Sequence, residues 1–370
     1  MGDLPIYLDY NATAPLLPGV LEAMAEAMAV PTNPSALHSF GQQAKRWVNQ
    51  SRRIIADTID AHPDHIIFTS GGTESNNFVL KGFPWQNVLI SGVSHDSIYK
   101  VLASFDEISL DSHGLLDLSV LEIYLKDQKG PTLISVILAH NESGVIQPLD
   151  DVVALAKKYQ AYVHVDAVQA LGKMPVSFKK MGVDFMTLSA HKIGGPHGVG
   201  VLVAKEIFSL HPLIEGGGQE RGHRSGTENV PGIIGLGAAL RGHSFDHMHT
   251  LKRWHQSMEE DLENFCSDVH IYGKDVDRLP NTTALAMPFV ESATQVMHFD
   301  LAGIAVSMGA ACSSGRTQIS RSLQKMGSNP KLAQCAIRIS SGWNTKEDDL
   351  KKFTHAWKEA CTTLKKGKSS

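Results

Sequence analysis

The chain has 370 residues, of which 42% are apolar and 19% are charged, a composition in the range of ordinary globular proteins. Its 34 basic and 38 acidic side chains give a formal net charge of -4, which excludes a broad basic surface for nucleic acid or for an anionic membrane. No apolar run approaches the roughly 20 residues of a transmembrane helix, and the length exceeds the roughly 250–300 residues that one hydrophobic core organises, so we expect two domains.

The first residues, MGDLPIYLDYNATAP, lack the basic start and the apolar centre of a signal peptide. The chain contains four cysteines, Cys266, Cys312, Cys335 and Cys361, and no two of them form a CxxC pair. This spacing indicates neither a zinc site nor a disulfide framework. We therefore expect a reducing, cytoplasmic compartment, in which free thiols are available for chemistry.

Helical and strand patterns alternate over the first two thirds of the chain. Helical periodicity is found at residues 20–29, 38–59 and 151–160. Short runs rich in β-branched residues are found at 66–70, 88–91, 132–140, 161–166, 185–190 and 199–204. This alternation predicts an α/β fold with a large, mostly parallel sheet.

The pattern changes at about Phe245. A long helical stretch at 249–266 is followed by short strand-like runs at 281–288 and 336–340. We expect a large domain at 16–245 and a smaller α/β C-terminal domain formed by 246–370 together with 1–15.

Polar residues follow four of the predicted strands at the point where each strand ends. They are His95, Asn141, Asp166 with Gln169, and His191 with Lys192. In open α/β sheets, ligands bind beyond the carboxyl ends of the strands. If these strands are parallel, all of the polar residues lie at one edge of the sheet.

Lys192 lies in the glycine-rich run SAHKIGGPHGVG, and Asp166 ends the strand-like run HVD. A desolvated lysine amine is a nucleophile toward carbonyl groups, and an aspartate can pair with a protonated pyridine nitrogen. Each residue also has a simpler interpretation, a surface lysine beside a turn and a helix N-cap. Taken alone, neither residue decides between its two interpretations.

The run TSGGTESNN at 69–77 leads from a strand through two glycines into a helix. Glycines at a helix N-terminus let backbone N–H groups approach a phosphate. The same run is also compatible with an ordinary capping box.

With these residues assembled, the chain resembles the cysteine desulfurases of the class V aminotransferase family over essentially its whole length. The resemblance is carried by LDYNATAP, Asn33 and Pro34 followed by His38, FTSGGTESNN, HNESGVIQP, HVDAVQALGK, LSAHKIGGPHGVG, GGGQERGHRSGTENV, GAACSSG and AIRIS. It implies the aspartate aminotransferase-like fold of pyridoxal-phosphate-dependent transferases (fold type I). It also implies that Lys192 holds pyridoxal 5'-phosphate as a Schiff base.

The resemblance implies a role for each of the other motif residues. Asp166 would pair with the pyridinium nitrogen, Gln169 would bind the phenolic oxygen, and His95 would stack on the ring and assist proton transfers. The phosphate would be bound by Gly72, Thr73, Ser189 and His191, with Thr227 from the opposite subunit of a homodimer. Asn141 and Arg338 would face the substrate, with Arg338 binding its α-carboxylate in a bidentate manner.

The resemblance also assigns the reaction, in which L-cysteine becomes L-alanine and Cys312 keeps the sulfur as a persulfide. The sulfur would then pass to an acceptor protein such as an iron–sulfur scaffold. The other three cysteines fit buried thiols better, since each lies in or beside a predicted helix or strand. The chain departs from the housekeeping members of the family at Gly315, Arg316 and Thr317 and ends sooner after Arg338, which leaves the identity of the acceptor open.

Three alternatives remain. A selenocysteine lyase would share the fold, the cofactor and nearly all of these residues. A transaminase or amino-acid lyase of the same fold would make Cys312 incidental. A cofactor-free binding or scaffold module would be expected to lack Lys192, Asp166 or Cys312, and all three are present.

Overall fold

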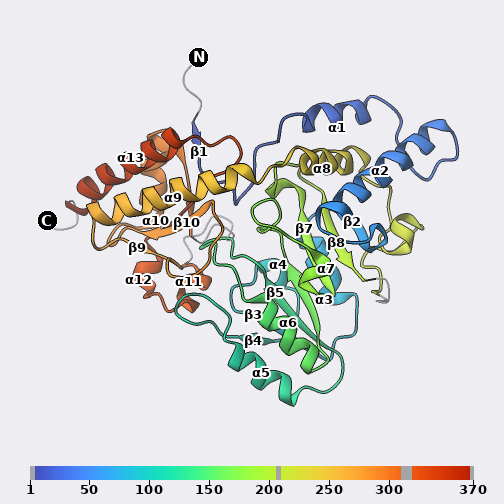
Figure 1. Cartoon of the computed structure of the whole chain (residues 1–370), viewed down its shortest axis with the longest axis horizontal. Helices are drawn as coiled ribbons and strands as arrows, with labels where there is room; N and C mark the ends of the chain where they lie inside the picture. The colour runs from blue at the N-terminus through green and yellow to red at the C-terminus, as the bar shows by residue number, and fades with distance from the viewer. Residues whose placement is uncertain (1–4, 206–209, 310–318, 367–370) are drawn as a thin grey trace.

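The computed structural model describes residues 5–205, 210–309 and 319–366, and its centre is a seven-stranded sheet (Figure 1). The strand order is β2 (Ile66–Thr69), β8 (Gly200–Ala204), β7 (Phe185–Ser189), β6 (Tyr162–Asp166), β5 (Thr132–Ile137), β3 (Asn87–Ser91) and β4 (Asp106–Ile108). Neighbouring strands from β7 to β4 are parallel, whereas β8 is antiparallel to both β7 and β2. The predicted large and mostly parallel sheet is confirmed.

Hydrophobic runs explain why these segments form central strands. Every residue of β2, β5, β7 and β8 is buried, as expected for strands that helices cover on both faces. The covering helices are α1 (Val20–Met28), α2 (Ser39–Thr58), α3 (Gly72–Lys81), α4 (Asp96–Tyr99), α5 (Leu118–Asp127), α6 (Leu149–Lys158), α7 (Phe178–Met181) and α8 (Val230–Gly242).

A second, smaller α/β unit follows α8. Its antiparallel sheet has the order β12 (Ser307–Met308), β13 (Ala336–Ser340), β10 (Thr282–Ala286) and β9 (His270–Ile271). Its helices are α9 (Asp246–Phe265), α10 (Ser292–Leu301), α11 (Arg321–Lys325), α12 (Pro330–Ala333) and α13 (Glu347–Lys366). The long helices α9 and α13 pack side by side (Figure 1).

The N-terminal segment joins this second unit. Strand β1 (Ile6–Tyr7) pairs in parallel with β11 (Ile304–Ala305), and Leu8 belongs to the hydrophobic core of the C-terminal unit, which is separate from the cores of the large sheet. These contacts support a division into 16–245 and 1–15 plus 246–370, which stays a proposal. Among the helices of the described ranges, none combines the length and the apolar character needed to cross a membrane.

The loop between β2 and α3 packs tightly against β8. A Cβ atom at Gly200 would lie 2.4 Å from the main-chain carbon of Gly71, which is closer than van der Waals contact permits. The absence of a side chain at Gly200 therefore allows the start of α3 to approach the sheet.

We predict that Gly200→Ala lowers the free energy of unfolding by about 1–3 kcal/mol, because backbone must move to admit the methyl group. Gly242→Ala is the matched control, since a Cβ atom there would meet no neighbour within 4 Å. Thermal unfolding of both purified variants checks this expectation. Equal melting temperatures for the two variants would show that the contact at Gly71 does not constrain residue 200.

Candidate active site

The carboxyl ends of β3, β5, β6 and β7 meet at one cavity of about 300 Å³. Ten residues singled out from the sequence line it, namely Gly72, Thr73, His95, Asn141, Asp166, Gln169, Ser189, His191, Lys192 and Arg338. The expectation that the strands run in parallel and deliver their polar residues to one edge is confirmed. The individual roles of these residues remain proposals.

Lys192 follows β7 in a short 3-10 turn, Ala190–Lys192, that places its amine in the cavity. Its Nζ atom donates hydrogen bonds to the main-chain carbonyls of Asn11, at 2.7 Å, and of Ala12, at 2.8 Å. The N-terminal segment therefore fixes the position of this amine, although nothing in the sequence pattern around Lys192 indicated that contact.

Asp166 is the last residue of β6 and is buried. One carboxylate oxygen accepts a hydrogen bond from the Asn76 side-chain amide at 2.9 Å, and the other accepts one from the Val168 backbone N–H at 3.0 Å. These two hydrogen bonds fix the orientation of the carboxylate at the cavity. Such a group can pair with a protonated ring nitrogen.

His95 begins α4, and its Nδ1 atom accepts a hydrogen bond from the Ser97 backbone N–H at 3.1 Å. Burial lowers the pKa of His95, an effect that the Asp166 carboxylate partly opposes. A neutral imidazole that accepts at Nδ1 carries its proton at Nε2. His95 can therefore present an N–H group at Nε2.

The N-terminus of α3 gives the cavity a region that is suited to an anion. The helix begins at Gly72, and among the described residues no side chain caps it, so the N–H groups of its first turn are available to an anion. A Cβ atom at Gly72 would lie 3.0 Å from a methyl carbon of Val168. Thr73 and Ser189 add hydroxyl groups to the same region of the cavity.

His191 lies beside these hydroxyl groups and has a perturbed pKa. Burial, with a smaller contribution from the charge of Lys192, lowers the pKa of His191 to about 4. The ring is therefore neutral at pH 7 and would bind an anion as a hydrogen-bond donor. Its Nδ1 atom lies 3.3 Å from the Thr13 hydroxyl.

Arg338, in β13, closes the cavity from the C-terminal unit and is only 2% exposed. One Nη atom donates to the Asn141 carbonyl at 3.0 Å, and the other donates to the Asp9 carboxylate at 2.5 Å. Its Nε atom has no hydrogen-bond partner among the described residues. A buried guanidinium with an unused donor is suited to a substrate carboxylate.

Several residues around the cavity were missed by sequence reasoning. Asn11, Asn76 and Ser97 line it, although no role was predicted for any of them. The motifs LDYNATAP and TESNN, which contain the two asparagines, carry a signal only as parts of the family resemblance.

Glu142 is a further missed residue, next to Asn141 and fully buried. It accepts a hydrogen bond from the Ser320 hydroxyl at 2.6 Å. Burial raises the pKa of Glu142 to about 7, although Arg338 and Arg321 oppose the shift. Its charge therefore changes in the neutral pH range.

Two predicted site residues are not among those that line the cavity. Thr227 is exposed on the surface of the single chain. Cys312 lies within 310–318, outside the described residues.

The donor set fits pyridoxal 5'-phosphate. The cavity offers an amine for the aldehyde, a carboxylate for the ring nitrogen, and an uncapped helix N-terminus with hydroxyl groups for the phosphate. The buried carbonyl oxygen of the Asn76 side chain has no partner among the described residues, so it is another polar atom that a bound group can satisfy.

Comparisons with known proteins identify the family of the chain. The family model "Aminotransferase class-V" matches residues 6–353. The chain is similar to a cysteine desulfurase IscS of Dictyoglomus turgidum, with 37% identity over 93% of this chain and 91% of the relative. A cysteine desulfurase of Sinorhizobium fredii is 38% identical over 93% of each chain.

Among solved structures, a NifS-like protein from Rickettsia africae aligns with a TM-score of 0.89 and 37% identity, covering 96% of this chain and 99% of that one. The family model spans both structural units, from β1 into α13. The chain belongs to the class V aminotransferase family.

Proposed function

We propose that this chain is a pyridoxal-phosphate-dependent cysteine desulfurase, which converts L-cysteine to L-alanine and transfers the sulfur to Cys312. The observation that carries this proposal is the convergence of Lys192, Asp166 and Arg338 on one cavity. These residues are a cofactor anchor, a partner for the cofactor ring and a binding group for an amino-acid carboxylate.

Pyridoxal phosphate, when bound, supplies an electron-withdrawing ring that makes the bonds at the substrate's α-carbon easier to break. Lys192 anchors it covalently, and Asp166 keeps the ring nitrogen protonated. The N-terminus of α3, with Thr73, Ser189 and His191, binds the phosphate.

The remaining residues orient the substrate and move its protons. Arg338 binds the α-carboxylate through its unused donor, and Asn141 lies beside it. His95, with its proton at Nε2, faces the cavity and would assist proton transfers there as a hydrogen-bond donor. Burial keeps the pKa of His95 below its ordinary value, so the neutral ring predominates near neutral pH.

The described residues on either side of 310–318 support Cys312 as the sulfur acceptor. On one side, Ser307 in β12 lies opposite Arg338 in the sheet. On the other side, Ser320 donates its hydrogen bond to Glu142, next to Asn141. Both of these flanking residues thus contact residues at or next to the cavity.

The net reaction conserves atoms and electrons. The Cβ–S bond of L-cysteine breaks, and a new S–S bond forms between that sulfur and Cys312. The Cβ carbon gains a hydrogen and is reduced, and the two sulfur atoms are oxidised to the level of a persulfide. A thiolate is the required nucleophile.

Selenocysteine lyase is the second candidate function. The two relatives reported above, at 37% and 38% identity, are named cysteine desulfurases, which favours sulfur over selenium as the element transferred. A thiol at Cys312 is also consistent with attack on the sulfur of cysteine.

A homodimer is part of the proposal. Four large apolar side chains of the α1–α2 region are exposed in the single chain, namely Leu21, Met28, Leu37 and Phe40, and a second subunit would cover them. Thr227 is also exposed in the single chain. Exposure before the dimer forms is required of a residue that contacts the phosphate in the opposite subunit.

We also propose a fate for the sulfur. The name IscS of one relative supports delivery of sulfur to an iron–sulfur scaffold protein. We place the reaction in the cytoplasm, where the free thiols of a reducing compartment persist.

We predict that Cys312→Ser still binds the cofactor and L-cysteine but releases sulfide at least roughly 100-fold more slowly, because a serine hydroxyl does not ionise near neutral pH. Sulfide release with dithiothreitol and the visible spectrum of the bound cofactor are the two measurements. Cys266→Ser is the control and should retain wild-type release.

Persistent sulfide release by Cys312→Ser would remove this residue from the mechanism. The same proteins are also given L-selenocysteine. A wild-type enzyme that turns over selenocysteine and leaves cysteine unchanged would instead support the lyase function.

We predict that mixing Lys192→Ala with Thr227→Ala subunits restores activity. If Thr227 serves the opposite subunit, each mixed dimer contains one site with both native residues, so random exchange recovers about a quarter of wild-type activity. Sulfide release is measured after the subunits are unfolded and refolded together. Activity no greater than the mean of the two parent variants would contradict a shared site.

A further inference from the structure

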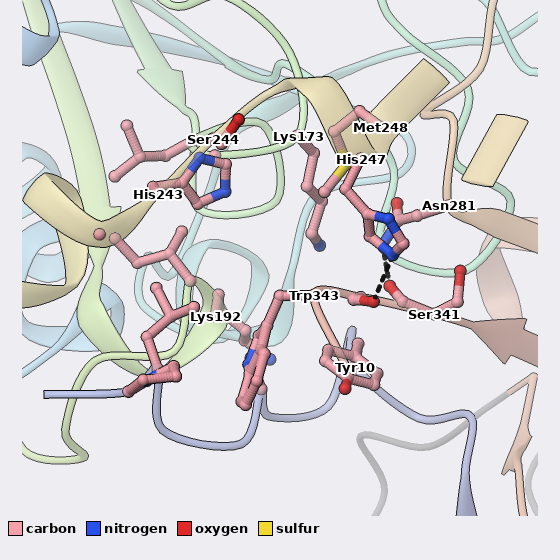
Figure 2. A pocket seen from close by; sticks show the side chains of 18 residues that line it. Tyr10, Lys173, Lys192, His243, Ser244, His247, Met248, Asn281, Ser341 and Trp343 are labelled. Carbon is pink, nitrogen blue, oxygen red and sulfur yellow. Dashed lines mark hydrogen bonds between the residues drawn. The ribbon is translucent and has the colours of Figure 1, made fainter. Parts of the chain in front are cut away.

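A second cavity, of about 310 Å³, is lined by Lys173, His243 and Trp343 among others (Figure 2). Lys192 lines both cavities, and Lys173 lines the second one. The amine of Lys173 bonds to Asn11 and Gln169, both of which line the first cavity. Lys173 therefore lies between the two cavities, and the proposed function gives it no role.

Lys173 is buried in the turn that follows β6, four residues after Gln169. Its Nζ atom donates hydrogen bonds to the side-chain oxygen of Asn11 at 2.7 Å and to that of Gln169 at 2.5 Å. Either protonation state of the amine has the two N–H groups that these contacts require.

These contacts determine the orientation of the Gln169 amide. Its oxygen must face the lysine donor, and its nitrogen must face the Asn11 main-chain carbonyl, to which it donates at 3.0 Å. The reversed amide would place its own N–H groups against Lys173 and its oxygen against a carbonyl oxygen. The second N–H of Gln169 is then left for the cofactor cavity.

The orientation of Asn11 is fixed in the same way. Its side-chain nitrogen donates to the Asn141 carbonyl at 3.2 Å and to the Thr282 hydroxyl at 2.9 Å, so its oxygen faces Lys173. The Asn11 main-chain carbonyl accepts from both Gln169 and Lys192. Lys173 is thus connected through two amides to the residues that contact the cofactor.

We propose that Lys173 is a positioning residue that holds the Gln169 amide with an N–H group directed at the phenolic oxygen of pyridoxal phosphate. The inference rests on the proposed function, in which Lys192 holds that cofactor. An N–H donor stabilises the negatively charged phenolic oxygen. As a result, the linkage between Lys192 and the cofactor would lose its proton at a lower pH.

The charges around Lys173 come from several elements. Lys192 follows β7, and Arg338 lies on β13; together with burial, these two cations hold the pKa of Lys173 well below its usual range. His191 lies near Lys192 and Lys173, whose charges add to the effect of burial in lowering the pKa of His191. His243, His247 and Tyr10 line the second cavity (Figure 2), and Asp166 lies across the first.

The test is a pH titration of the visible absorption of the cofactor-loaded enzyme without substrate. Lys173→Met removes both donors, so the Gln169 amide is free to rotate, and we expect the titration midpoint to rise by about one pH unit. Gln169→Leu should raise it by a similar amount. The double variant should rise no further than Gln169→Leu, because Lys173 acts through Gln169.

Two further variants complete the design. Lys205→Met removes a lysine that pairs with Asp184 at 2.9 Å, at the opposite end of β7, and should leave the midpoint unchanged. If Lys173→Met does not fold, Lys173→Ala replaces it, since it removes the same donors.

A wild-type midpoint in a folded, cofactor-loaded Lys173 variant would overturn the inference, as would additive shifts in the double variant. A lower melting temperature with no change in midpoint would assign Lys173 a structural role only. Failure of the wild-type protein to develop a visible band with pyridoxal phosphate would instead overturn the proposed function.

Discussion

The parallel alignment of β3, β5, β6 and β7 is the constraint on which the site depends. Strands that run in the same direction end at the same edge of the sheet, so residues far apart in the sequence meet there. The register of these strands is well determined, because helices cover the sheet and the strand residues are almost all buried. The positions of His95, Asp166 and Lys192 relative to one another therefore follow from the packing of the large sheet.

Bringing polar groups together away from water has a free-energy cost, and hydrogen bonds at the edge of the sheet offset it. The N-terminal segment supplies many of them. It leaves β1, which pairs with β11 of the C-terminal unit, and then contacts Lys192 and Gln169 through Asn11. A rigid set of donors and acceptors needs little rearrangement when a charged group binds. The same segment connects the two structural units at the cavity.

Hydrophobic periodicity predicted six of the seven strands of the large sheet, since a strand buried on both faces produces a continuous apolar run. Strand β4 and helices α5 and α8 were not predicted. Among the predicted strands, the largest difference at one end is at β5, which ends at Ile137, although the apolar run was expected to continue to 140. Beyond Ile137 the backbone turns toward the cavity, and Ala139 makes only an isolated bridge to Ile146.

Contacts between distant segments could not be predicted from pattern. Asp9 and Arg338 form a partly buried ion pair across 329 positions of the sequence, and Lys173 contacts Asn11 across 162. Spacing rules describe neighbours along a helix or a strand, so they carry no information about such pairs. The roles of Thr227 and Cys312 depend on a second subunit and on residues outside the described ranges, so they rest on the family resemblance.

The central claim is that Lys192 is the covalent anchor of pyridoxal phosphate. It is tested most directly by reducing the loaded enzyme with borohydride, digesting it and locating the pyridoxyl group by mass spectrometry. We predict one modified lysine, in the peptide that contains SAHKIGG. A pyridoxyl group on Lys173 or on a surface lysine, with Lys192 unmodified, would contradict the assignment of the site.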